Sequence, residues 1–153
     1  MLFRSAALAK RDLCNTVSMA IELTDGTIIT SKTSALLSAP AALILNSLKH
    51  LAGISDELLL ISPAIIEPIS AMKINNLGNK NPRLHADEVL IALSISAQTN
   101  PLADMAIKKL SMLKDCEAHS TAILATVDSE VFKKLKINLT SEAEVYAKKL
   151  YHK

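Results

Sequence analysis

The sequence has little of several residue types, and each shortage excludes a class of protein. Trp is absent, aromatic residues make up 3% of the 153 residues, and there are only three glycines. Glycine-rich phosphate loops and aromatic platforms that stack on single-stranded nucleic acid are therefore not expected. The two cysteines, Cys14 and Cys116, cannot form a disulfide framework and fit a reducing compartment. We therefore expect a cytoplasmic protein with an aliphatic core.

Long runs of like charge and long apolar runs are also missing. Seventeen basic and fifteen acidic residues give a net charge of +2, and they are scattered, so no surface for nucleic acid is predicted. The longest apolar stretches, Ala35 to Leu45 and Leu58 to Ile69, contain Ser, Pro or Glu and are shorter than the roughly 20 residues that a membrane span needs. Neither nucleic acid nor a membrane is expected as a partner.

Apolar residues are abundant for a single domain. Half of the residues are hydrophobic and 21% are charged, which indicates apolar surface that a partner covers. An upstream domain of the same chain, or a second copy of the chain, would cover this apolar surface. A helix is expected almost from Met1, without a capping residue. We interpret residues 1–18 as a remnant helix of a truncated upstream region and 19–153 as a C-terminal α/β domain.

The spacing of apolar and turn residues predicts an α/β fold. Two β-rich runs, Met19 to Leu23 and Thr27 to Thr30, flank Asp25-Gly26, a dipeptide typical of a tight β-hairpin. Further along, capping residues and apolar periodicity predict several helices and one buried strand. The helices are expected at 6–17, 38–53, from 62 onward, 87–98 and 102–113, and the strand at 58–61.

The last part of the chain predicts a strand-helix-strand unit. Ala118 to Ala125 is expected as a strand, Asp128 as the cap of a helix from Ser129 to Lys136, and Ile137 to Thr140 as a second strand. A strand, a helix and a strand in succession form a βαβ-like unit, which favours parallel pairing of its two strands. Together with the hairpin, it predicts a mixed sheet with helices packed against it.

A polar loop from Lys73 to His85 interrupts this pattern. Because it runs into the start of a helix, backbone N–H groups there can meet an anion together with basic side chains of the loop. We expect charge pairing from Lys80 and Arg83, and hydrogen bonding or proton transfer from Asn81 and His85. The candidate ligand-binding residues are Asn79, Lys80, Asn81, Arg83, His85 and His119.

Two structural alternatives remain open for these residues. Asn, Gly and Pro are what a surface loop needs for its turns, and Asp87 and Glu88 already serve the helix dipole. His119 lies in an expected strand beside Ser120, where a base and a nucleophile would be possible. Alternation places their side chains on opposite faces, and polar strand residues also bond to neighbouring backbone.

No metal site is predicted. His85 and Glu88 have the i, i+3 spacing of ligands on one helix face. Cys116 and His119 offer a thiolate and an imidazole, but residues three apart on a strand point to opposite faces. Zinc sites normally show tighter clustering of Cys and His.

Three runs are distinctive as an ordered set: Asn75 to His85 (NNLGNKNPRLH), Asp87 to Ile95 (DEVLIALSI) and Cys116 to Thr121 (CEAHST). With Ile137 to Thr140 and the ending Lys148 to Tyr151, they resemble the C-terminal part of the bacterial domain-of-unknown-function family 1846. The resemblance covers most of the chain and implies an upstream part with a glycine-rich segment that resembles a phosphate-binding loop. Some relatives carry the label ATP-dependent peptidase, but neither H-E-x-x-H nor G-x-S-x-G occurs here.

The sequence therefore leaves the function unassigned, specifies no cofactor and does not decide whether the protein is an enzyme. One hypothesis is an accessory C-terminal domain that helps a missing nucleotide-binding-like domain to bind an anionic or phosphorylated small molecule. The alternative is a non-catalytic oligomerisation or assembly module. In that case the apolar helix around Leu43 to Leu51 would make the subunit contacts.

Overall fold

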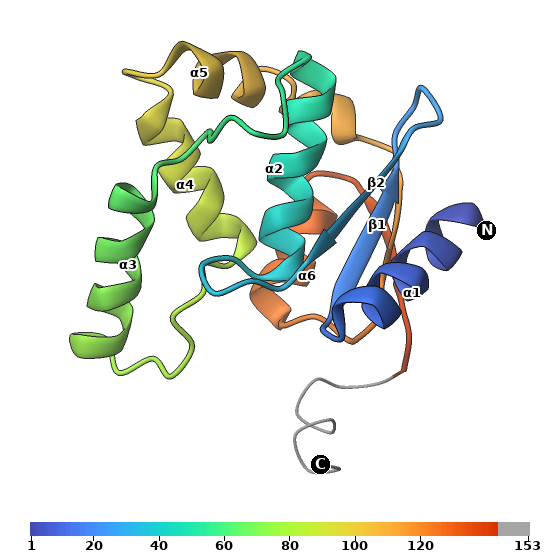
Figure 1. The fold of residues 1–153 in the computed structure, drawn as a ribbon, viewed down its shortest axis with the longest axis horizontal. Helices are drawn as coiled ribbons and strands as arrows, with labels where there is room; N and C mark the ends of the chain where they lie inside the picture. Colours follow the sequence, from blue (N-terminus) through green and yellow to red (C-terminus); the bar gives the residue numbers. More distant parts are fainter. Residues whose placement is uncertain (144–153) are drawn as a thin grey trace.

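The computed structural model describes residues 1–143 of the chain and confirms the α/β fold. The ending Lys148 to Tyr151, which contributed to the family resemblance, lies outside these residues. Figure 1 shows the arrangement of the elements. The helices are α1 (Leu2–Cys14), α2 (Ala39–Ala52), α3 (Pro63–Asn75), α4 (Ala86–Ser96), α5 (Pro101–Ile107), α6 (Thr126–Lys134) and the 3-10 helix η1 (Leu110–Leu113). The strands are β1 (Ser18–Glu22), β2 (Ile28–Lys32), β3 (Glu117–Ser120) and β4 (Asn138–Ser141).

The four strands form one mixed sheet in the order β2-β1-β3-β4. β1 runs antiparallel to β2 and to β3, whereas β3 and β4 are parallel and α6 connects them. At the hairpin turn, Thr27 N donates to Asp25 Oδ1 at 2.9 Å. Gly26 has a φ of 85°, a value that residues other than glycine rarely adopt. The predicted hairpin and the predicted strand-helix-strand unit are both confirmed.

Helices cover both faces of the sheet. On one face, Phe3 and Ala7 of α1 pack with Ala20 of β1. Because side chains alternate along a strand, Met19 and Ile21 point to the other face, where they belong to the larger core cluster. Figure 1 shows α1 on one side of the β1–β2 hairpin and α2 on the other.

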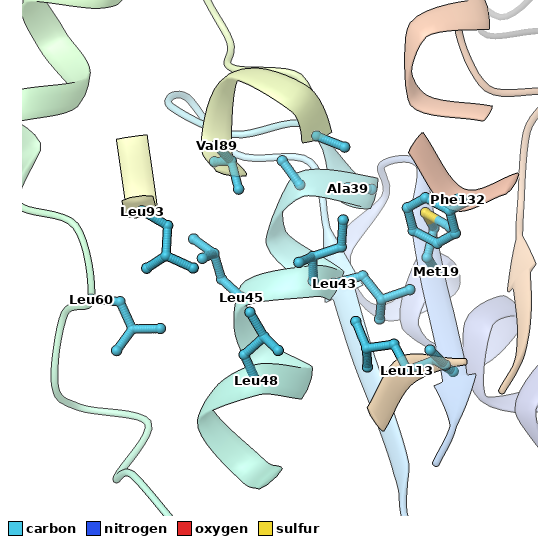
Figure 2. Packing of buried hydrophobic residues seen from close by; sticks show 14 of the residues in the cluster. Met19, Ala39, Leu43, Leu45, Leu48, Leu60, Val89, Leu93, Leu113 and Phe132 are labelled. Atoms are coloured by element: carbon cyan, nitrogen blue, oxygen red, sulfur yellow. The ribbon is translucent and has the colours of Figure 1, made fainter. Parts of the chain in front are cut away.

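The larger core is aliphatic, as its composition predicts. Figure 2 shows the Phe132 ring beside Met19, with Leu43 and Leu113 near them. Leu43 is 1% exposed and Leu48 is fully buried. The apolar residues of α2 that suggested subunit contacts therefore belong to the core of the domain.

Three expected elements differ from the structure. The strand expected from Ala118 to Ala125 is shorter, since β3 ends at Ser120. Residues 58–61 form no strand, although Leu60 and Ile61 are buried, because a short apolar run can be buried without pairing in a sheet. The single helix expected at 102–113 is two shorter pieces, α5 and η1. Within residues 1–143, every helix is too short or too polar to cross a membrane.

Candidate functional site

A pocket of about 140 Å³ lies at one end of the sheet. Thr33 directly follows β2, Val17 directly precedes β1, and Ala122 comes shortly after β3. In α/β proteins, ligands commonly bind outside the carboxyl ends of strands, and β2 and β3 end here. Polar lining comes from Thr33, Ser38, Asn81, Arg83, His85 and Asp128, and apolar lining mainly from Val17, Pro40, Ile123 and Leu124.

Three helices begin at this pocket. Their N-cap residues are Ser38 for α2, His85 for α4 and Ala125 for α6, and all three line the pocket. The Ser38 hydroxyl accepts from Ala41 N at 3.3 Å, whereas no side chain in the described part of the chain caps the start of α6. Each helix start contributes a partial positive charge. The backbone therefore gives this pocket a positive potential.

A short bridge joins the loops that precede α2 and α4. Leu37 pairs with Leu84 in parallel orientation. Ser38 N donates to the Leu84 carbonyl at 3.1 Å, and Leu84 N donates to the Leu36 carbonyl at 2.9 Å. Leu84 is fully buried. The bridge thereby holds the starts of the two helices side by side.

The Arg83 guanidinium is anchored through one of its nitrogens. Arg83 Nε donates to the Ser34 carbonyl, and Arg83 N donates to Asn81 Oδ1 at 3.0 Å. Within residues 1–143, neither Nη atom of Arg83 makes a hydrogen bond or ion pair. A fork of two guanidinium nitrogens suits carboxylate and phosphate oxygens, so these atoms are available to an anion.

His85 and Asp128 form a pair at the same pocket, in which Asp128 is buried and His85 is half-buried. Asp128 is 3% exposed. Its Oδ2 lies 3.0 Å from His85 Nδ1, and its Oδ1 accepts from Ala86 N at 2.8 Å. The hydrogen bond with Asp128 raises the pKa of His85, and partial burial of the ring opposes this effect. His85 Nε2 has no hydrogen-bond partner within residues 1–143.

Asp128 was not predicted as a site residue. The sequence places it as the cap of a helix from Ser129, but α6 begins at Thr126 with Ala125 as its N-cap. Asp128 therefore lies within the first turn of the helix, and its carboxylate binds the start of α4. Its partners are 42 and 43 residues away, and a local capping signal cannot reveal them.

A buried lysine holds the loop that carries Arg83 against the start of α4. Lys73 is 2% exposed, and its Nζ donates at 2.7 Å both to the Arg83 carbonyl and to Glu88 Oε1. The same Glu88 oxygen accepts from His85 N at 2.8 Å. The sequence predicts Glu88 as a dipole partner at the helix start, and weighs it as a metal ligand, whereas Lys73 is predicted only as the start of a loop.

The structure brings three of the six predicted ligand-binding residues together. Asn81, Arg83 and His85 line the pocket. Asn79 and Lys80 are exposed on the same loop and lie outside the lining of the pocket. Only the part of the loop next to the bridge and α4 therefore reaches the site.

The sixth residue, His119, lies in a different environment. It is paired with Ala20 across β1 and β3, which places it on the face that α1 covers. His119 Nδ1 is 2.7 Å from Thr140 Oγ1, and Nε2 is 2.6 Å from Glu142 Oε2. Glu142 also accepts two hydrogen bonds of 3.0 Å from Arg4 of α1. His119 thus belongs to a network that ties α1 to the sheet.

The residues weighed as metal ligands do not assemble. Across residues 1–143, no three or more His, Cys, Asp and Glu side chains are grouped to hold a metal ion. Cys116 is 2% exposed, and burial raises the pKa of its thiol. A thiol that is protonated and buried is a poor nucleophile.

Comparison with known proteins places this chain in a family. The family described as "Domain of unknown function DUF1846, C-terminal" matches residues 2–151. The chain belongs to this family. Its relatives include a UPF0371 protein of Corynebacterium urealyticum, 53% identical over 134 residues that cover 88% of this chain and 27% of the relative. A UPF0371 protein of Clostridium botulinum is 51% identical over 143 residues, 94% of this chain and 28% of the relative.

The DUF1846 chain therefore spans between a quarter and a third of the length of these curated relatives. A UPF0371 protein of Corynebacterium diphtheriae shows the same proportions, with 51% identity over 88% of this chain and 27% of the relative. The names of these relatives state no ligand and no reaction. The site in the DUF1846 domain has to be interpreted from its own geometry.

Proposed function

We propose that this DUF1846 domain binds a small anionic or phosphorylated ligand in the pocket at the end of the sheet. One observation carries the proposal: Arg83 and His85 both line the pocket, and among residues 1–143 the Arg83 Nη atoms and His85 Nε2 have no partner. The starts of α2, α4 and α6 at the same place add a positive potential. In the longer family proteins, the upstream part would supply the remaining contacts to the ligand.

The acidic residue in the pocket does not oppose this function. Asp128 is buried, and both of its oxygens already accept hydrogen bonds, from Ala86 N and from His85. A carboxylate whose charge is matched in this way contributes less repulsion than a free one. Glu88 is similarly paired with Lys73 at 2.7 Å. Arg83 therefore remains the charge that a ligand meets first.

Titration with an inorganic anion tests the proposal. The 153-residue chain would be labelled with 15N and titrated with sulfate and with phosphate at low ionic strength while amide signals are followed by NMR. We expect saturable shifts at the starts of α2 and α6 and around His85. Arg83→Ala should weaken binding about tenfold or more, because a hydrogen bond to a charged group contributes about 1.5–3 kcal/mol.

A matched control separates a site from general charge attraction. Arg11 lies on α1, outside the lining of the pocket, so Arg11→Ala removes the same charge at another place. We expect an unchanged affinity for this variant. Equal weakening by both substitutions, or shifts that never saturate, would contradict a site at this pocket.

Two broader proposals concern the domain boundary and the compartment. We propose that the C-terminal domain includes α1 instead of beginning at residue 19, because Phe3 and Ala7 pack on β1 and Arg4 donates to Glu142. We also propose that the protein is cytoplasmic, which the free thiols of Cys14 and Cys116 support. Limited proteolysis of a full-length family protein tests the boundary, since cleavage near residue 18 would contradict it.

A second candidate function is assembly, and exposed apolar residues on α4 favour it. Ile91 and Ile95 are 61% and 62% exposed and lie one turn apart on the same helix face. These residues replace the buried apolar residues of α2 as the candidate contact. Light scattering of the chain and of Ile91→Asp tests this function, since a concentration-dependent dimer should dissociate in the variant. A monomer at all concentrations would contradict it.

A further inference from the structure

Asp128 controls which nitrogen of His85 carries a proton. Its Oδ1 is occupied by Ala86 N, a fixed backbone donor, so Oδ2 is the oxygen that faces His85 Nδ1 at 3.0 Å. An ionised carboxylate only accepts hydrogen bonds, and His85 Nδ1 must therefore carry the hydrogen. Neutral His85 is then held as the Nδ1–H tautomer, with a lone pair on Nε2.

The state of Nε2 decides how His85 meets an anion. In the neutral ring, the Nε2 lone pair would face the oxygens of the ligand and repel them. When His85 takes up a proton, Nε2 becomes an N–H donor and the ring becomes cationic, while the bond from Nδ1 to Asp128 stays in place. A single proton thus converts the ring from an unfavourable to a favourable neighbour for an anion.

Charged groups from four segments lie around His85. Asp128 from α6 and Glu88 from α4 favour protonation of His85, and Lys73 from α3 opposes it. Asp87 adds a negative charge in the first turn of α4, and Arg83 of the loop lines the same pocket. With three negative and two positive charges in this group, protonation of His85 removes the excess negative charge that an anion would meet.

We infer that anion binding in this pocket is coupled to the uptake of one proton by His85, and that Asp128 acts as the positioning residue that directs this proton to Nε2. The inference rests on the proposed function, because it concerns the same ligand. The hydrogen bond from His85 Nδ1 to Asp128 also raises the pKa of His85, which moves its protonation toward neutral pH. In the bound state, His85 bridges Asp128 and the anion.

The test measures sulfate affinity of the 153-residue chain between pH 6 and 9 at constant ionic strength. Sulfate keeps its charge of −2 over this range, so a change in affinity reports on the protein. Above the pKa of His85, the affinity should fall about tenfold per pH unit, as coupling to one proton requires. Binding of sulfate at fixed pH should in turn raise the pKa of His85.

Two variants and one spectroscopic signature separate positioning from a structural role. His85→Asn retains an N–H donor for Asp128 and is an acceptable helix N-cap, but it does not titrate, so its sulfate affinity should not change with pH. In Asp128→Asn, the pKa of His85 should be lower and the loss of affinity should begin at lower pH. Side-chain 15N NMR of the wild-type chain should show neutral His85 as the Nδ1–H tautomer.

Three results would each overturn a different part of the proposal. A wild-type affinity for sulfate that is independent of pH would overturn the proton coupling and leave the anion site standing. No saturable binding at any pH would overturn the anion site itself. The Nε2–H tautomer in the wild-type chain would overturn the role of Asp128. Side-chain 15N NMR of the wild-type chain tests this role even if Asp128→Asn does not fold.

Discussion

Lys73 Nζ lies 2.7 Å from Glu88 Oε1 and the same distance from the Arg83 carbonyl. One buried ammonium group therefore joins α3, the loop that carries Arg83, and the first turn of α4. An ammonium group at this depth needs its partners, because burying an unpaired charge is costly. The position of the loop that carries Arg83 thus depends on a buried contact of Lys73.

Removal of this ammonium group should destabilise the domain. Lys73→Met keeps most of the volume of the side chain but leaves Glu88 without its ionic partner. We expect a loss of about 1.5–3 kcal/mol in the free energy of unfolding, measured by urea denaturation. Lys80→Met, on an exposed part of the same loop, should change the value by less than about 0.5 kcal/mol. Equal effects of the two substitutions would show that Lys73 has no special role.

Truncation in α2 tests whether its apolar face is core or contact surface. Leu43 is 1% exposed, and Leu43→Ala should reduce the free energy of unfolding by about 2–5 kcal/mol because it leaves a cavity. Leu58 is 45% exposed, and Leu58→Ala should have a much smaller effect. A Leu43→Ala variant with unchanged stability but altered oligomeric state would restore the assembly role of this helix.

The sequence predicts the secondary structure better than the site, for a physical reason. Pairs such as Asp25-Gly26 at the hairpin and Ser62-Pro63 at the start of α3 act over a few residues, so their effect on the backbone is visible locally. Arg83 and His85 could be predicted because a basic loop before a helix start is a local anion signal.

The partners of the site residues arise from tertiary contacts that no local pattern encodes. Asp128 resembles a helix cap in sequence, yet its carboxylate binds residues of another helix. Lys73 begins a polar segment and was therefore expected to be solvated, and only the packing of α3 buries it. His119 was expected with the ligand-binding residues, but alternation along β3 and the position of α1 direct it to the other face.

Stability should depend on pH through His85. Its pKa is raised in the folded domain, so protonation favours folding. The resulting stability is fully present below the unfolded pKa of about 6.5 and is lost as the pH rises through the folded pKa. Urea denaturation from pH 5.5 to 8.5 should show this decline for the wild-type chain and not for His85→Asn. The same slope in both proteins would contradict the prediction.

Glu142 should confer the opposite dependence on pH. The hydrogen bonds from Arg4, with a smaller contribution from His119, hold the pKa of this carboxyl below its ordinary value. The stabilisation is present above the unfolded pKa of about 4.3 and is lost as the pH falls through the lower folded pKa. Glu142→Gln should therefore be less stable than the wild type near neutral pH, and the difference should disappear in acid. Thermal unfolding at several pH values measures it.

The bridge between Leu37 and Leu84 has a consequence for the entropy of binding. Because two backbone hydrogen bonds hold the loops before α2 and α4 together, the walls of the pocket are ordered before any ligand arrives. An anion that enters loses less free energy to ordering of the protein than it would in two independent loops. In the proposed anion site, the bridge would therefore act as a rigid frame, and selectivity would come from how well the shape of the anion fits that frame.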